Sequence, residues 1–263
     1  MKKYLFIAKS QIMSNMQYIT NIFGGFIGFT LILIILFNLY QYLYSDPNEL
    51  INGYSMHQMI WYVIITELLW SILGGSKMSK KIANDVKSGN ITYNINKPYS
   101  YVGYCLASNI GDLFLKFIFY TIFGMVLGIF FVGHFPNLNI ISALIVIVIS
   151  FLALVISILF ITSIGLVSFF IEDASPLYWL YSKFILVLGT IFPIEFFPVF
   201  MQKILIFSPI YVVSYGPARL FVNFNYVDAI NIFCAQVIYI FACYALCSFI
   251  YGKGVKRINV NGG

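Results

Sequence analysis

Charge is scarce in this sequence: of 263 residues only 9% are Asp, Glu, Lys or Arg, whereas 61% are apolar. Soluble domains are nearer about 45–50% apolar and about 25% charged. Nine acidic and fifteen basic residues cannot cover a water-exposed surface, so the composition excludes an ordinary soluble protein and indicates an integral membrane protein. The net charge of +6 does not indicate nucleic-acid binding, because the basic residues lie between apolar stretches.

Groups that carry chemistry are equally sparse. The four cysteines form no C-x-x-C pair, and the two histidines, His57 and His134, belong to no Cys/His cluster in the sequence. The sequence also lacks a G-x-x-x-x-G-K-[ST] phosphate-binding loop. We therefore expect no catalytic residue and no metal or cofactor bound by this chain.

Long apolar stretches predict an all-α membrane protein with six transmembrane helices, because about 20 apolar residues cross a bilayer as a helix. Residues 1–19 place Leu5, Ala8, Ile12, Met16 and Ile19 on one helical face, which predicts a helix lying on the membrane surface. A basic leader to the first span is the alternative. One transmembrane domain is expected over residues 1–263, with spans at 22–43, 56–73, 113–132, 140–171, 176–192 and 229–251.

The apolar segment 193–228 differs from the spans because Pro198, Pro209 and Pro217 interrupt it. Each proline blocks a continuous helix, so we expect short re-entrant helices that enter the outer leaflet and return. A seventh span is the alternative, but it would place the basic C-terminal segment on the outer side.

Basic residues orient the spans. The loops SDPNEL and GHFPNLN contain no Lys or Arg. By the positive-inside rule, both termini and the loop 74–100 are therefore expected in the cytosol. The basic residues on which this orientation depends are Lys2, Lys3, Lys9, Lys77, Lys80, Lys81, Lys87, Lys97, Lys253, Lys256 and Arg257.

Residues 76–90 predict a short amphipathic helix on the cytosolic side, ending near Gly89. Its lysines favour lipid headgroups, and its narrow apolar stripe equally suits a groove on a partner protein. The stripe consists of Met78, Ile82 and Val86, and the polar faces carry Lys80, Lys81, Asp85 and Lys87.

Several ionisable residues lie in or beside the spans. Glu67 falls near the centre of the second span, where it either lines a translocation path or is protonated and hydrogen-bonded within a helix interface. Asp112 and Lys116 are four residues apart and are expected to pair on one helix face. The cytosolic turn carries Glu172 and Asp173, which either meet basic residues or remain solvated. Arg219, on the expected outer side, either binds a lipid phosphate or substrate carboxylate or extends to the interface.

Three stretches carry a resemblance to a known family. DVKSGNITYNINKPYSYVGY, IEDASPLYWLY followed by GTIFP, and SPIYVVSYGPARLFV resemble, in that order, segments of bacterial type-2 ABC exporter permeases. The resemblance implies a subunit of the bacterial cytoplasmic membrane that pairs with a second permease subunit and with ATPase subunits that hold ATP and Mg²⁺. It also implies that residues 76–90 are the coupling helix that contacts the ATPase.

Two other classes of function remain as alternatives. A proton-coupled secondary transporter would use Glu67, although such proteins often show inverted repeats and several charges within the membrane. A membrane enzyme acting on lipid would need a cluster of polar residues at one membrane face. The sequence does not identify the substrate.

Overall fold

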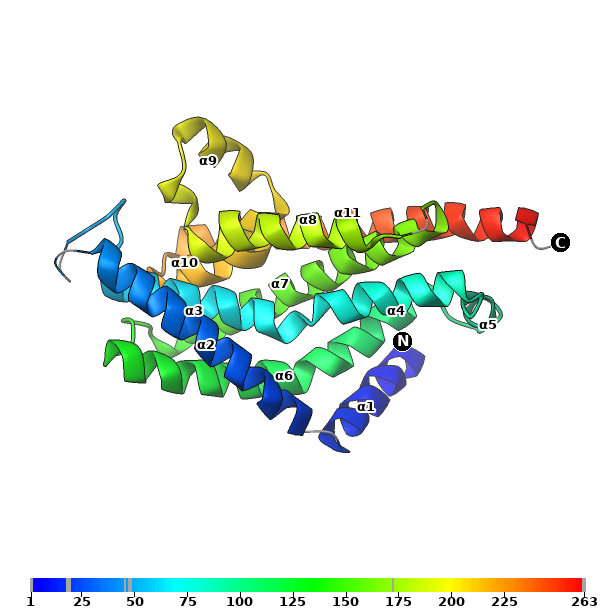
Figure 1. The fold of residues 1–263 in the computed structure, drawn as a ribbon, viewed down its shortest axis with the longest axis horizontal. Coiled ribbons are helices and arrows are strands. Elements are labelled where there is room, and N and C mark those ends of the chain that lie inside the picture. Colours follow the sequence, from blue (N-terminus) through cyan, green and yellow to red (C-terminus); the bar gives the residue numbers. More distant parts are fainter. Residues whose placement is uncertain (1, 18–19, 45, 47–48, 172, 262–263) are drawn as a thin grey trace.

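The computed structural model describes residues 2–17, 20–44, 46, 49–171 and 173–261, and these residues are mostly helical (Figure 1). Five helical stretches are long and apolar enough to cross a membrane, and a pair bent by 80° makes a sixth if it counts as one span. The predicted all-helical membrane fold with a bent segment before the last span is confirmed. The helices are α1 (Lys2–Gln17), α2 (Thr20–Leu43), α3 (Met56–Leu73), α4 (Gly75–Lys87), α5 (Ile91–Ile95), α6 (Tyr101–Val132), α7 (Ile140–Leu166), η1 (Val167–Phe169), α8 (Ser175–Ile185), η2 (Leu186–Ile191), η3 (Ile194–Phe196), α9 (Val199–Ile206), η4 (Tyr211–Tyr215), α10 (Gly216–Val222) and α11 (Tyr226–Asn261).

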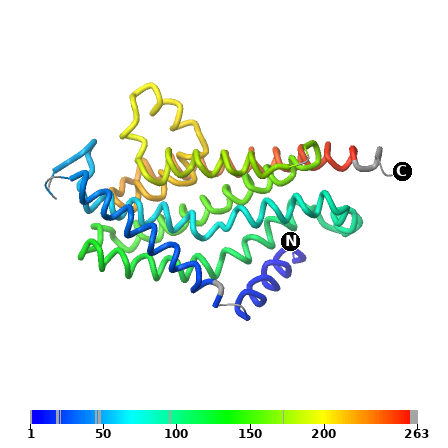
Figure 2. The backbone as a smooth tube through the Cα atoms, viewed as in Figure 1, coloured from blue at the N-terminus to red at the C-terminus, as the bar shows by residue number. Residues whose placement is uncertain are grey.

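Both chain termini lie at the end of the molecule that holds α4 and α5 (Figures 1 and 2). We call this the basic end and define it as residues 2–9, 77–99 and 252–257. The loops that follow α2 and α6 lie at the opposite end. This arrangement is the one that the distribution of lysines predicts, and the side of the membrane that each end faces stays a prediction.

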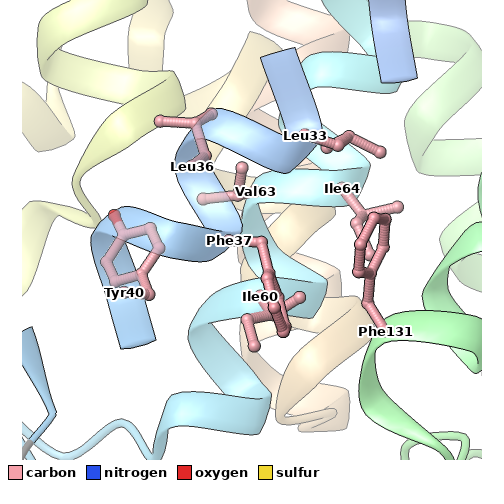
Figure 3. Close-up of a pocket in the computed structure, with 8 residues that line it drawn as sticks. All are labelled: Leu33, Leu36, Phe37, Tyr40, Ile60, Val63, Ile64 and Phe131. Carbon is pink, nitrogen blue, oxygen red and sulfur yellow. The ribbon is translucent and has the colours of Figure 1, made fainter. Parts of the chain in front are cut away.

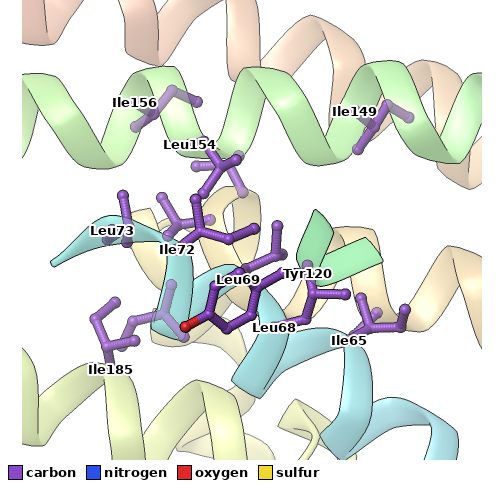
Figure 4. Packing of buried hydrophobic residues seen from close by; sticks show 14 of the residues in the cluster. Ile65, Leu68, Leu69, Ile72, Leu73, Tyr120, Ile149, Leu154, Ile156 and Ile185 are labelled. Atoms are coloured by element: carbon purple, nitrogen blue, oxygen red, sulfur yellow. The ribbon is translucent and has the colours of Figure 1, made fainter. Parts of the chain in front are cut away.

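Helix α3 lies at the centre of the bundle and packs against α2, α6, α7 and α10. It begins with a capping box, in which the Gln58 backbone N–H donates to Ser55 Oγ and the Ser55 N–H donates to Gln58 Oε1. Leucines and isoleucines of α3 pack against α7 and α8, as Ile72, Leu154 and Ile185 illustrate (Figure 4). The central position of α3 makes Glu67 a buried residue of the core.

The seam between α2 and α3 is almost completely filled. Leu36 and Tyr40 of α2, Val63 of α3 and Phe131 of α6 surround a gap of about 10 Å³ (Figure 3). A gap of this size holds at most one water molecule, and its lining is apolar except for the Tyr40 hydroxyl. It is a packing defect and not a ligand site.

Helix α6 approaches α3 closely through glycine. A Cβ atom on Gly128 would lie 2.1 Å from Cη2 of Trp61, and one on Gly124 would lie 3.0 Å from Leu68 Cδ1. Small residues four positions apart let membrane helices approach in this way. The contact sets the distance between the two helices that carry Glu67 and Tyr120.

Helix α8 continues into the π-helix η2, whose carbonyl groups accept hydrogen bonds from neighbouring helices. The hydroxyls of Tyr62 and Ser214 both donate to the Gly189 carbonyl, at 2.7 and 2.9 Å, and Thr66 donates to the Thr190 carbonyl at 3.1 Å. A π-helix disturbs the regular hydrogen-bond ladder, so these donors satisfy groups that would otherwise be costly to bury. They join α8 to α3 and η4.

The helices extend beyond several of the predicted spans. Helix α6 begins at Tyr101, where Ser100 caps it, and not at residue 113. Residues 101–112, which the prediction placed before the span, are therefore helical as well. Helix α11 runs from Tyr226 to Asn261, well beyond residue 251. Charged and polar residues extend a helix past the bilayer as readily as apolar ones, so hydropathy marks the spans and not the helix ends.

Candidate functional site

A cleft of about 750 Å³ lies between α1, α2, α3, α4 and α6, with one residue of α8 at its wall. This volume is in the range of about 300–1,000 Å³ that is typical of ligand sites. Glycines of α2, Gly25 and Gly28, leave part of its wall without side chains. The polar residues that line it include Gln11, Asn15, Glu67, Ser71, Lys77, Lys81, Ser108, Asn109, Asp112, Lys116 and Tyr120.

Glu67 is the most deeply buried carboxylate of the cleft, with 1% of its surface exposed. Its Oε1 accepts a hydrogen bond from Ser71 Oγ at 3.2 Å, and among the described residues it makes no ion pair. Phe29 and Trp70 line the cleft beside it. Glu67 thus has the hydrogen bond expected of a protonated residue in a helix interface and also lines the cleft, so both predicted roles stay predictions.

A second polar group lies in the same cleft. Lys116 Nζ is 2.6 Å from Asp112 Oδ2, which confirms the predicted pair on one face of α6. Asn15 of α1 donates to the same carboxylate, with Nδ2 2.9 Å from Oδ1. The sequence did not predict that α1 takes part in this cleft.

The N-terminal helix therefore packs on α6. A Cβ on Gly111 would lie 2.4 Å from the Ala8 carbonyl oxygen, so the two backbones are in close contact. Leu5 and Met16, members of the expected apolar face, are 69% and 61% exposed and are free to contact lipid. Ile19, the last member of that face, lies outside the described residues. Part of the predicted apolar face, at Ala8, therefore packs on α6, and the rest of it, at Leu5 and Met16, is exposed.

The predicted coupling segment forms α4 and the turn after it, but its apolar stripe is turned inward. Met78 and Ile82 are 8% and 3% exposed and pack with α7, where Gly165 leaves room for the Ile82 side chain. Val86 is half-buried. The expectation that Met78 and Ile82 contact an ATPase is corrected, because both side chains are buried within the chain, Ile82 against α7 and Met78 at the wall of the cleft.

The charged residues of the segment lie at the surface of the basic end. Lys80, Lys81 and Lys87 are exposed, and the half-buried Asp85 accepts a hydrogen bond from Tyr101 at 3.1 Å. Beyond them the short helix α5 presents Tyr93, which is 73% exposed. The role of the lysines stays a prediction.

Asp173 is an exposed residue of the turn before α8. The pKa of its carboxyl is below the ordinary value, chiefly because the Ser175 backbone N–H donates to Oδ1 at 2.9 Å, with Lys87 and Lys80 adding to the effect. Asp173 makes no ion pair with a described residue, and whether it meets basic residues or remains solvated stays a prediction. Glu172 lies outside the described residues.

Arg219 has a partner within the chain, which the sequence analysis missed. Its Nε lies 3.4 Å from Oε1 of Glu195, and the Tyr215 hydroxyl donates to the same oxygen at 2.6 Å. The guanidinium carbon also lies 5.5 Å from the centre of the Tyr54 ring. The charge of Arg219 is therefore paired within the chain, and not with a lipid phosphate or a substrate carboxylate. The signal for this pair in the sequence was Glu195, an acid within the apolar segment 193–228.

The two histidines, distant in sequence, are neighbours in space. The rings of His57 and His134 meet edge to face with their centres 5.0 Å apart. No group of three or more potential metal ligands occurs within the part of the chain that the structure describes. The pair contributes to packing between α3 and the loop that follows α6.

The fold and the cleft define a multi-pass membrane protein whose helices enclose a ligand-sized space. Residues 29–262 match the family described as ABC-2 family transporter protein. The match covers most of the chain, so the protein belongs to the ABC-2 transporter family, whose members are membrane permease domains and not catalysts. No curated protein matches the sequence.

Proposed function

We propose that this chain is the membrane subunit of an ATP-driven exporter in a bacterial cytoplasmic membrane, with both termini in the cytosol. It forms the translocation path with a second permease subunit, either identical or related. Separate ATPase subunits, which hold ATP and Mg²⁺, bind at the exposed lysines of α4. The family supports the class of transporter, and permeases of this family generally pair with ABC ATPases.

The observation that carries the proposal is that α4 follows α3 directly, with only Gly74, in the left-handed conformation, between the two helices. The two helices form one stretch, Met56–Lys87, that passes the length and hydropathy criteria for a single span. One end of this stretch carries the exposed lysines, and its middle carries Glu67 at the cleft. A force applied at the lysines therefore reaches the cleft without crossing a flexible loop.

The contact between Ile82 and Gly165 extends the same path to α7. An ideal Cβ on Gly165 would lie 2.8 Å from Ile82 Cβ, so α4 and α7 cannot move independently at this point. Packed interfaces of this kind switch between discrete arrangements and do not deform continuously. ATP binding favours one arrangement only by the difference in free energy with which the ATPase binds the two.

The test is a purification of the tagged chain in mild detergent from its native membranes, followed by mass spectrometry and an ATPase assay. We expect a P-loop ATPase in stoichiometric amount. Reversing the charge of Lys80 and Lys87 to Glu should lower its recovery about tenfold, equivalent to about 1.4 kcal/mol. Ile82 is unsuitable for this test, because Asp at a buried contact would damage the fold.

The matched control reverses Lys253 and Lys256, two exposed lysines of α11 at the same end. This change alters the net charge equally, so its ATPase recovery should remain that of the native chain. Absence of any ATPase from the native preparation, or equal losses in both variants, would contradict the proposed docking.

One observation favours the proton-driven alternative, namely the Glu67 carboxylate without an ion pair in the cleft. Membrane vesicles decide between the two mechanisms. The measured quantity is transport of a lipophilic dye across the vesicle membrane. Transport that continues with a proton gradient after ATP is depleted would support proton coupling, and transport that stops would support the ATP-driven mechanism.

A further inference from the structure

We propose that the cleft beside Glu67 binds a lipophilic cation, whose positive charge pairs with the Glu67 carboxylate. The inference rests on the proposed function, because it names the class of substrate that the cleft of the exporter accepts. Its starting point is the contrast between the two carboxylates of the cleft. Asp112 has Lys116 at 2.6 Å and Asn15 at 2.9 Å, whereas Glu67 has Ser71 at 3.2 Å.

A carboxyl group at this depth is stable either as the neutral acid or as a carboxylate with a cation beside it. Burial of an ionised group without a counter-ion is costly, and one neutral hydroxyl compensates only part of that cost. Among the described residues no Lys or Arg lies within ion-pair distance of Glu67. A bound cation would supply the missing charge, and a bound anion would be repelled by the same carboxylate.

Aromatic rings complete the chemistry. Phe29, Trp70 and Tyr120 line the cleft together with Glu67. The face of an aromatic ring attracts a cation and also accepts an apolar substituent, so one set of side chains serves both parts of a lipophilic cation. The volume of about 750 Å³ is sufficient for a molecule of several fused or attached rings.

A zwitterionic lipid headgroup suits the cleft less well. Such a headgroup would need a free cation of the chain for its phosphate beside Glu67. Of the three lysines that line the cleft, Lys116 is already paired with Asp112 at 2.6 Å, and Lys77 and Lys81 belong to α4. Lys77 and Lys81 are exposed, so solvent and salt screen them, whereas the charge of Glu67 acts in the dry interior.

The experiment measures equilibrium binding of tetraphenylphosphonium to the purified chain in detergent, without nucleotide. Tetraphenylborate, an anion of almost the same shape, shows how much binding is due to the apolar surface alone. We expect saturable binding of the cation to the native chain and a loss of at least about tenfold in affinity in Glu67→Gln. Binding of the anion to the native chain should be weaker than that of the cation, and it should not fall in Glu67→Gln, because that change removes the charge that repels the anion.

The control variant is Glu49→Gln, which removes an exposed carboxylate in the loop before α3 and should bind the cation like the native chain. A second measurement needs no variant at residue 67. Dicyclohexylcarbodiimide modifies carboxyl groups in apolar surroundings, and mass spectrometry locates the product. Tetraphenylphosphonium should slow modification of Glu67 in the native chain, and tetraphenylborate should not.

Equal affinity for cation and anion, unchanged affinity in Glu67→Gln, or failure of the cation to protect Glu67 would each overturn the proposal. These results are independent of the ATPase. A chain that binds the cation but recovers no ATPase would refute the exporter mechanism alone, and a chain that recovers the ATPase but does not bind the cation would refute the substrate class alone.

Discussion

The contact between Gly128 and Trp61 provides a quantitative test of the packing that shapes the cleft. A Cβ on Gly128 would lie 2.1 Å from Cη2 and 2.2 Å from Cζ3 of the Trp61 ring. The ring cannot move aside easily. The Trp61 side chain is 1% exposed, its Nε1 donates to the His134 carbonyl at 3.0 Å, and the centres of the Trp61 and Phe221 rings are 5.3 Å apart. Gly128→Ala should therefore strain the interface between α3 and α6.

The expected magnitude combines two opposing terms. Overpacking of a well-filled site costs about 1–3 kcal/mol, and replacing a helical glycine by alanine regains about 0.5–1 kcal/mol. Because the clash is with a ring that cannot move easily, the overpacking cost lies in the upper part of its range, at about 2–3 kcal/mol, and the net loss is about 1–2.5 kcal/mol of unfolding free energy. At about 2–4 °C per kcal/mol for a chain of this size, the melting temperature should fall by about 2–10 °C.

The assay uses the protein's own thiols. Cys105, Cys243 and Cys247 are buried and free, so a maleimide dye that fluoresces on reaction reports their exposure during heating in detergent. The control is Gly24→Ala, since a Cβ on Gly24 meets nothing within 4 Å. This control should melt at the native temperature or slightly above it.

A double variant separates the contact from other effects of the substitution. Trp61→Phe removes the outer ring atoms and the hydrogen bond to the loop, and so destabilises the chain by itself. With Gly128→Ala added, the loss should be smaller than the sum of the two single losses by about 0.5–3 kcal/mol. A native melting temperature in Gly128→Ala, or strict additivity in the double variant, would refute the tight packing of α3 on α6.

Two further predictions concern charged groups outside the cleft. Arg219→Ala leaves the Glu195 carboxylate with only the Tyr215 hydroxyl of its present polar contacts. The melting temperature should therefore fall by about 2–4 °C, equivalent to about 1 kcal/mol. Replacing both Arg219 and Glu195 by Gln should lower the melting temperature less, and an equal or larger fall would argue against the pair. Asp173 is ionised at neutral pH, and because its pKa is lowered, the hydrogen bond that it accepts from the Ser175 N–H is lost only as the pH falls through that lowered pKa. Protection of the Ser175 amide against hydrogen exchange should accordingly fall on acidification below the ordinary pKa of an aspartate, and constant protection would exclude this hydrogen bond as its cause.

The predicted spans illustrate what hydropathy can and cannot locate. Residues 56–73 coincide with α3 as observed, because a capping signal at Ser55 and a glycine at Gly74 bound the apolar run. Helix α6 begins twelve residues before its predicted span, since the preceding polar segment is also helical. An apolar pattern therefore locates the bilayer-facing part of a helix more accurately than its ends.

The candidate site was only partly predictable. Glu67 was identified because a charge in a span is costly wherever its helix packs. The remaining walls of the cleft come from α1, α2, α4 and α6, and no local pattern states which helices meet. The role of Asn15 and the pairing of Arg219 with Glu195 depend on contacts between residues that are 97 and 24 positions apart, respectively.

The amino-acid sequence by itself determined that this protein is a multi-pass helical membrane protein with its basic residues at one end. Those properties follow from transfer of each segment into the bilayer, which depends on local composition. Only the tertiary structure decided that the stripe of Met78 and Ile82 faces α7, and that Glu67 faces a cleft. An amphipathic pattern specifies that one face avoids water, and any apolar neighbour satisfies it. The choice of neighbour depends on the packing of the whole bundle, in which glycines such as Gly165 decide how closely two helices approach.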